Sequence, residues 1–198
     1  MRELPWQRVG KTVSYLAITP RPVQLPYPPI WIDVTGPETI ATAAKNGCAI
    51  LPAASMSNDM VVERYESFST ELHTAGRSPE EIERPLLRDL FVAASREDAI
   101  ELVGDAFLAQ YRLHAEVGDL ADASGGRITS DACTLEYLLE HHLIVGDPDD
   151  VFDQLKVLQH KAGINHVLCR MSPIGIGHLD VLASMRLFAG EVITRLRS

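Results

Sequence analysis

One turn of the chain carries the residue types that bind a phosphate group. Thr35, Gly36 and Thr39 stand where an apolar stretch ends and a predicted helix begins. The first N–H groups of a helix have no partner within it, and the helix dipole is positive at that end. Two hydroxyl groups, and a glycine that permits close approach, make this turn a candidate anion site. The alternative is an ordinary helix cap with Thr35 as the N-cap residue, and the negative charges of Asp33 and Glu38 favour that alternative.

Arg170 is the second candidate, near the carboxyl end of a strand predicted at residues 165–171. A guanidinium group can bind a phosphate or a substrate carboxylate through two hydrogen bonds, and an ion pair within the protein is the alternative. Cys169 would need a neighbouring base or cation to act as a nucleophile. His166 lies three residues away on the same strand and points to the opposite face, so a buried, inert thiol is the better interpretation of Cys169.

Other kinds of chemistry have little support in the sequence. The remaining histidines are scattered without the spacing of metal ligands, so we expect no metal site. Neither a phosphate-binding GxxxxGK[ST] loop nor a dinucleotide-binding GxGxxG motif occurs. Three widely spaced cysteines suit neither a disulfide framework nor a zinc site. We therefore expect reduced cysteines and a cytoplasmic protein.

Composition excludes further classes of protein. The 198 residues include 18 basic and 27 acidic side chains, a net charge of −9. Nucleic-acid binding requires clustered basic residues, so we expect no such partner. No apolar run approaches the roughly 20 residues that cross a bilayer, and the first seven residues do not resemble a secretory signal. With 46% hydrophobic residues, the chain has the composition of an ordinary globular protein.

The elements that position these residues begin after a proline-rich segment. Seven of the twelve prolines lie within residues 1–37, and residues 21–29 should be extended. We therefore predict a lead-in arm at 1–29, followed by one domain at 30–198.

Within that domain, strands and helices are predicted to alternate. β-branched and apolar runs predict strands at 30–35, 48–53, 86–93 and 165–171. Capping residues, prolines and glycines delimit helices at 37–46, about 58–75, 95–117, 131–141, 146–162 and 179–196. The Gly-, Ser- and Asp-containing residues 118–130 are either a mobile lid or a solvated surface loop.

Four βα units with a helical insertion imply an α/β fold with a parallel sheet. Two architectures remain open on these grounds. One is a small doubly wound sheet with helices on both faces. The other is half of a (β/α)8 barrel, with helices on one face only.

Five stretches in order resemble luciferase-like, flavin-dependent monooxygenases. The resemblance spans nearly the whole chain and matches the part of the family that forms the last four barrel strands, so it implies the C-terminal half of a (β/α)8 TIM barrel. The stretches are PRPVQLPYPPIWI at 20–32, PETIATAAKNG at 37–47, VGDPDDV at 145–151, AGINHVL at 162–168 and SMRLFAGEV at 184–192.

The resemblance also implies function. Such enzymes use reduced FMN and O2 to oxygenate an organic substrate, and a flavin reductase is an expected partner. Relatives that use the deazaflavin F420 for hydride transfer share the same half of the fold. The resemblance places Thr35, Gly36 and Thr39 at the flavin phosphate, and Arg170 is a further candidate cofactor-binding residue. The family's other half, with many flavin contacts, has no counterpart here, so the alternative is a non-catalytic flavin-binding or assembly module.

Two structural expectations follow from a half barrel. Asp33 lies among apolar neighbours and should be buried against a cation, Arg170 or Arg88. One sheet face should be uncovered and should carry either the set Ile30, Ile32, Val34, Leu51, Phe91 and Val167 or the residues that alternate with them. We therefore expect a homo-oligomer, or pairing with a complementary barrel half.

Overall fold

The computed structural model describes residues 6–8, 11–13, 19–25, 27–122 and 124–197 and divides into two units, residues 1–30 and 31–198. In the first unit, strands β1 (Trp6–Arg8) and β2 (Lys11–Val13) form an antiparallel pair that the sequence analysis did not predict. The described residues from 19 to 30 belong to no helix or strand, and the chain bends at 19–20 and 23–25.

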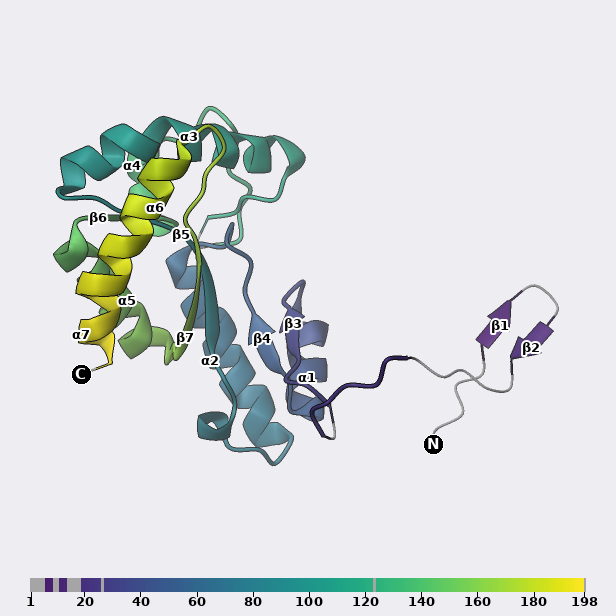
Figure 1. Ribbon diagram of the computed structural model, residues 1–198. Helices are drawn as coiled ribbons and strands as arrows, with labels where there is room; N and C mark the ends of the chain where they lie inside the picture. The colour runs from purple at the N-terminus through teal and green to yellow at the C-terminus, as the bar shows by residue number, and fades with distance from the viewer. Residues whose placement is uncertain (1–5, 9–10, 14–18, 26, 123, 198) are drawn as a thin grey trace. The chain divides into compact units, whose positions relative to one another are not determined.

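The second unit contains short parallel strands (Figure 1). Strand β3 (Trp31–Asp33) pairs with β4 (Ala49–Leu51). A three-stranded sheet has the order β6-β5-β7, with β5 at Pro85–Val92, β6 at Ile144–Gly146 and β7 at His166–Arg170. The four predicted strands are present within a few residues of their expected bounds. Strand β6 was missed, because its three residues directly precede the Asp147 cap that was interpreted as a helix start.

Helices follow each of these strands, at the places where caps predicted them. The first, α1 (Pro37–Asn46), ends at Gly47, whose φ of 67° is the left-handed conformation that favours glycine. Ser57, Ser95 and Asp147 cap α2 (Asn58–Thr74), α3 (Arg96–Val117) and α5 (Pro148–Ala162). The predicted last helix is one helical run with a π segment, made of α6 (His178–Leu187), η2 (Phe188–Ile193) and α7 (Thr194–Leu196).

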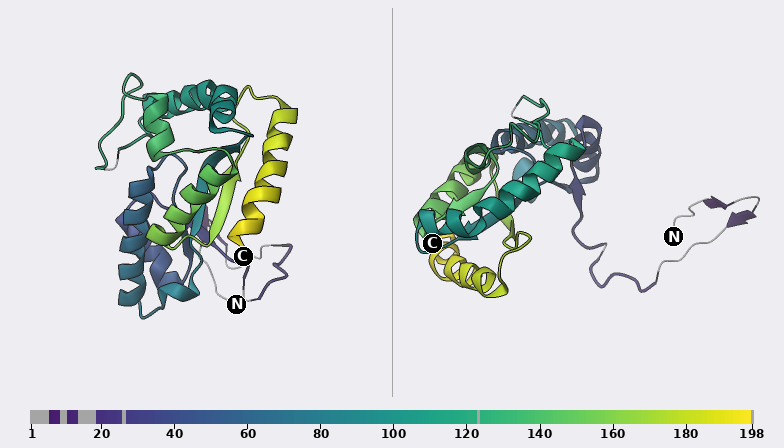
Figure 2. Two further views of the ribbon diagram at one scale, coloured as in Figure 1. Left: turned by 90° about the vertical axis from the view of Figure 1, so that its left-hand side faces the viewer. Right: turned by 90° about the horizontal axis from the view of Figure 1, so that it is seen from above.

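The helices α1, α2, α5 and α6 pack against one face of the strands. The side chains of Leu86, Leu90 and Val92 on β5 are buried in a core that includes residues of all four helices. Seen from above, these helices form an arc around the strands (Figure 2). On the opposite face, Leu87 and Leu168 are only half-buried. The one-sided arrangement matches half a barrel and not a doubly wound sheet.

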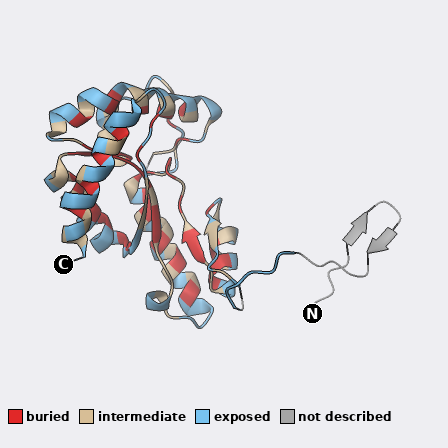
Figure 3. Ribbon diagram, in the orientation of Figure 1, coloured by how far each residue is buried: buried red, intermediate tan, exposed pale blue. Residues whose placement is uncertain are grey.

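A second core lies at the end of the sheet where β5 ends (Figures 1 and 3). There α3 and α4 (Leu135–His141) pack together over Phe91 and Val145. Residues 118–130 are anchored to this core through the buried side chains of Leu120 and Ile128.

The expectation that Asp33 is buried against a cation is wrong, because Asp33 is exposed and Arg88 and Arg170 have other partners. The open face carries residues of both expected sets: the alternates Trp31 and Leu168 with Leu51 and Leu87, whereas Val34 is buried in the helix-covered core. Phe91 lies on the same face of β5 as Leu87, but α3 and α4 cover it.

Candidate functional site

The turn before α1 is a helix cap centred on Thr39. Its hydroxyl oxygen accepts hydrogen bonds from the backbone N–H groups of Gly36, at 3.0 Å, and Thr35, at 3.2 Å. The same hydroxyl donates to the carbonyl of Gly36 at 2.8 Å. Gly36, not Thr35, is the N-cap residue, so the cap is formed by a side chain that reaches back from within the helix.

Donors and space for an anion remain at this turn. Thr35 is exposed, and its hydroxyl contacts only the Thr39 hydroxyl, at 3.2 Å, among the described residues. The N–H of Glu38 lies at the second helical position, where no partner exists within α1. A Cβ atom added to Gly36 would meet no atom within 4 Å. The backbone of Gly36 is extended, with φ of 173°, so other residues could adopt this conformation without strain. What distinguishes the position is therefore the open space beside it. These features fit a phosphate group.

A cavity of about 330 Å³ adjoins the turn. Its walls come from residues 33–35, from the loop that follows β4, and from the segment 118–121 after α3. These segments lie at the carboxyl ends of β3 and β4, the end of the strands where barrel enzymes bind their ligands.

A buried polar network lies at the end of the neighbouring strands. Asp89 on β5 is 2% exposed and pairs with Arg170 on β7 through Nε, at 2.8 Å, and Nη2, at 2.5 Å. The Tyr111 hydroxyl lies 2.9 Å from Asp89 Oδ2 and 3.0 Å from the carbonyl of Ala54. The hydrogen bond to Asp89 raises the pKa of Arg170, and burial raises that of Tyr111. The ion pair considered as the alternative for Arg170 is therefore present.

Arg88 points from the other face of β5 into the loop after β4. It is fully buried and donates to the carbonyls of Ala54, at 3.1 Å, and Met56, at 2.8 Å, and to the side-chain oxygen of Asn58, at 3.1 Å. Burial lowers its pKa to about 10, so the guanidinium stays charged at neutral pH. Neither Arg88 nor Asp89 was among the candidate site residues, although two consecutive charges inside the apolar strand LLRDLFVA were the available signal.

His142 is a third buried polar side chain in this region. It lies against the rings of Tyr111 and Tyr137, at centroid distances of 5.6 and 5.5 Å. Both ring nitrogens are buried, and within the described ranges neither has a partner at good hydrogen-bond geometry. Burial, with a smaller contribution from the Arg88 charge, lowers its pKa to about 4.

Thiol and metal chemistry find no support in the described part of the chain. Burial raises the pKa of Cys169 to about 11, which keeps the thiol protonated at neutral pH. His166 is on the same strand but contacts Asn165, at 3.1 Å. Within the described ranges, no three His, Cys, Asp or Glu side chains gather as metal ligands would. No helix there is long and apolar enough to span a membrane.

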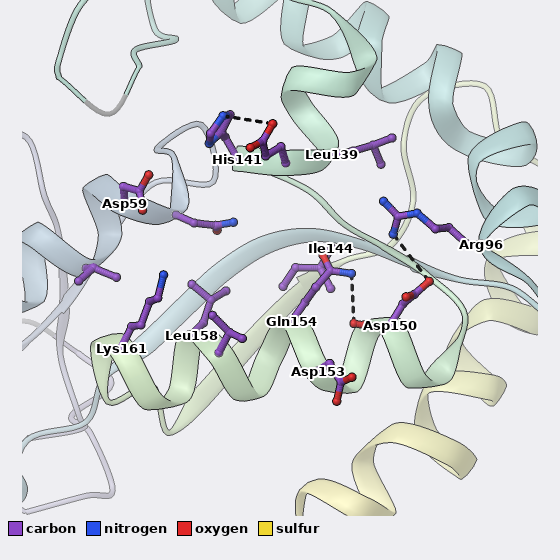
Figure 4. Close-up of a pocket in the computed structure, with 14 residues that line it drawn as sticks. Asp59, Arg96, Leu139, His141, Ile144, Asp150, Asp153, Gln154, Leu158 and Lys161 are labelled. Carbon is purple, nitrogen blue, oxygen red and sulfur yellow. Dashed lines mark hydrogen bonds and ion pairs between the residues drawn. The ribbon is translucent and has the colours of Figure 1, made fainter.

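Two other grooves contain none of the predicted site residues. One, of about 450 Å³, lies between α2, α4 and α5 (Figure 4). Four of its side chains form two pairs, Arg96 with Asp150 at 3.7 Å and His141 with Glu140 at 3.8 Å. The second, of about 990 Å³, lies beside the end of β5, between the first turns of α3 and a face of α6 that continues into η2. Neither groove is at the carboxyl ends of β3 and β4.

Comparison with known proteins gives a consistent result. A family model described as luciferase-like monooxygenase matches residues 8–166. The oxygenase component of a flavin-dependent trigonelline monooxygenase from Acinetobacter baylyi (strain ATCC 33305 / BD413 / ADP1) is 28% identical over 165 residues. That alignment covers 78% of this chain and 44% of the relative.

Solved structures with the same fold also extend beyond this chain. The oxygenating constituent of the FMN-bound 3,6-diketocamphane monooxygenase from Pseudomonas putida has a TM-score of 0.71 and 16% identity, and covers 98% of this chain and 58% of its own. The coenzyme F420-dependent tetrahydromethanopterin reductase from Methanopyrus kandleri has a TM-score of 0.59 and 24% identity, and covers 84% of this chain and 50% of its own.

The chain thus spans about half the length of the proteins that it matches. Together with the parallel strands and the one-sided helices, this confirms the predicted α/β fold, built as half of a (β/α)8 barrel.

Proposed function

Because the chain belongs to the luciferase-like monooxygenase family, we propose that it forms the flavin-binding half of an oxygenase acting on an organic substrate. Reduced FMN, when bound, supplies the chemistry that activates O2. The residues of this chain bind and orient the flavin and help to exclude water from it. A cytoplasmic location accords with the three free cysteines, Cys48, Cys133 and Cys169.

The observation that carries this proposal is the turn before α1. Thr35, Gly36 and Thr39 would hold the FMN phosphate at the positive end of the helix, in the open space above Gly36. The adjoining cavity of about 330 Å³ would receive the part of the flavin next to the phosphate. Arg170, held by Asp89, would face the flavin from strand β7, across the site from the phosphate.

The deazaflavin F420 is the alternative cofactor, and hydride transfer would then replace oxygenation. A structural relative depends on F420, and the same phosphate-binding turn would serve both cofactors. The relative that matches by sequence, at 28% identity, is the oxygenase component of a flavin-dependent monooxygenase, which favours FMN.

Two observations suggest partner proteins: the chain spans about half the length of its relatives, and one relative is the oxygenase component of a monooxygenase. We propose that a flavin reductase supplies reduced FMN and that a complementary barrel half, or a second copy, covers the open sheet face. A non-catalytic flavin-binding or assembly module is the second candidate, favoured by the same half-length. A mixture with the complementary half that oxygenates no substrate, although it binds reduced FMN, would support that second candidate.

Binding of FMN and of riboflavin, which lacks the phosphate, tests the phosphate site. Flavin fluorescence titration of the full chain should give a clearly higher affinity for FMN. Gly36→Asp should abolish FMN binding, because it places a negative charge in the open space. Gly36→Ala is the matched control, since extended backbone and free space accommodate a methyl group. Equal affinities for FMN and riboflavin, or FMN binding by Gly36→Asp, would contradict the proposal.

A further inference from the structure

We propose that the outer edge of the Arg170 guanidinium binds a carboxylate group of the organic substrate, with Asp89 as the residue that positions Arg170. The inference rests on the proposed function, because it assigns the substrate class of the same site. It makes organic acids the expected substrates.

The geometry of the pair leaves one edge of the guanidinium available. Asp89 and Arg170 are register partners on neighbouring strands. Asp89 accepts from Nε and Nη2 of Arg170 and faces the Tyr111 hydroxyl, so the carboxylate is engaged on both oxygens. Nη1 of Arg170 makes no hydrogen bond with the described residues, and 41% of the side chain is exposed. The edge formed by Nη1 and Nη2 has the spacing that binds the two oxygens of a carboxylate.

The charges of this network do not balance. Arg88 is fully buried, and its three hydrogen-bond acceptors are neutral oxygens. Tyr111 stays protonated, because burial raises its pKa. Two guanidinium groups therefore share one carboxylate, that of Asp89. Arg88 and Arg170 thus place two positive charges near one carboxylate, and this excess of positive charge attracts an anionic ligand to the exposed edge of Arg170.

Position in the sheet separates this edge from the phosphate turn. Thr35 follows β3, and Arg170 ends β7; β4 and β5 lie between these strands. Three strand spacings amount to roughly 14 Å along the sheet. Asp89 also holds the guanidinium toward β5. Flavin phosphate and substrate carboxylate would therefore occupy opposite sides of the site.

Calorimetric binding of benzoate and of benzamide to the full chain tests this assignment, because the two probes differ in charge and share the ring. The unchanged chain should prefer benzoate. Arg170→Lys keeps the positive charge but loses the two parallel N–H donors of the guanidinium. The double variant Asp89→Asn/Arg170→Gln removes both charges, so Asp89 is not left as an unpaired buried carboxylate. Both should lose about tenfold or more of that preference. Arg186→Gln is the control: it removes one positive charge at an exposed position on α6, and this variant should retain the preference for benzoate. Circular dichroism verifies folding, and the double variant decides if Arg170→Lys fails to fold.

The possible results separate this inference from the proposed function. Equal binding of benzoate and benzamide by the unchanged chain, or a benzoate preference that survives in the double variant, would overturn the carboxylate site. A double variant that loses affinity for reduced FMN but keeps the benzoate preference would assign the anion to the flavin and also overturn it. A benzoate preference that depends on Arg170, in a chain that binds no FMN, would contradict the proposed function and leave the carboxylate site standing.

Discussion

Two consecutive residues on β5 have opposite roles because side chains alternate along a strand. Arg88 points to the helix-covered face and fastens the loop after β4, with hydrogen bonds to Ala54, Met56 and Asn58. Asp89 points to the open face and holds Arg170. A single strand thus positions both the wall of the cavity beside Thr35 and the cation opposite it.

His142 should make stability depend on pH. Its pKa is about 4 in the folded protein and about 6.5 in the unfolded chain. Between these values the unfolded chain binds more protons, so stability is complete above pH 6.5 and falls as the pH falls toward 4. The loss should amount to about 3 kcal/mol over this range. Urea unfolding of the unchanged chain and of His142→Phe, at pH 7.5 and 4.5, measures it.

Comparing the unchanged chain with His142→Phe isolates the effect of His142, because every other titratable group is present in both proteins. His142→Phe should lose less stability than the unchanged chain between the two pH values. An identical loss in both proteins would show that His142 is not the group responsible.

At the scale of elements, the sheet is interrupted between β4 and β5. These strands are neighbours, but among the described strands from residue 31 onward the hydrogen-bonded ladders join β3 to β4 and β5 to its partners β6 and β7, with no ladder between β4 and β5. Tyr65 on α2 lies between them, with its hydroxyl 3.1 Å from the carbonyl of Ile50 and 2.5 Å from that of Pro85. A helix side chain therefore links the two parts of the sheet.

Tyr65→Phe should destabilise the protein by about 1–3 kcal/mol, because it leaves buried carbonyl groups without their donor. Thermal unfolding monitored by circular dichroism measures the change. Tyr137→Phe is the matched control, since the Tyr137 hydroxyl makes no hydrogen bond with any residue for which the structure gives a position. Equal stability of the unchanged chain and Tyr65→Phe would show that the link contributes nothing.

At the scale of the unit formed by residues 31–198, one sheet face and two strand edges are open. Among the described strands, β3 pairs only with β4, and β7 pairs only with β5. The half-buried side chains of Trp31, Leu87 and Leu168 lie on the open face. Unpaired edges and uncovered apolar side chains favour association with another chain.

We therefore expect the isolated chain to associate, with about 1,000 Å² or more buried between partners. Sedimentation equilibrium at low micromolar concentration should give a mass of at least two chains. Addition of a complementary barrel half should replace self-association. A stable 21.8 kDa species that resists protease and binds no hydrophobic dye would contradict this expectation.

The sequence by itself determined the local elements and the class of the protein. Caps, prolines and glycines act within a few residues, so the helices at 37–46 and 148–162 end where their glycines predict. The ordered motifs indicated the family and the half barrel. Strand β6 escaped prediction because it is three residues long and runs directly into the Asp147 cap of α5, so only its pairing with β5 identifies it.

Only the tertiary structure decided which side chains meet. Asp89 and Arg170 are 81 residues apart, and the local pattern around Asp33 suggested the wrong carboxylate for the arginine. Burial lowers the pKa of His142. The two tyrosine rings beside it, Tyr111 and Tyr137, come from different helices, so this burial depends on how the helices pack. Such contacts depend on strand register and on helix packing, which no local signal in a single chain encodes.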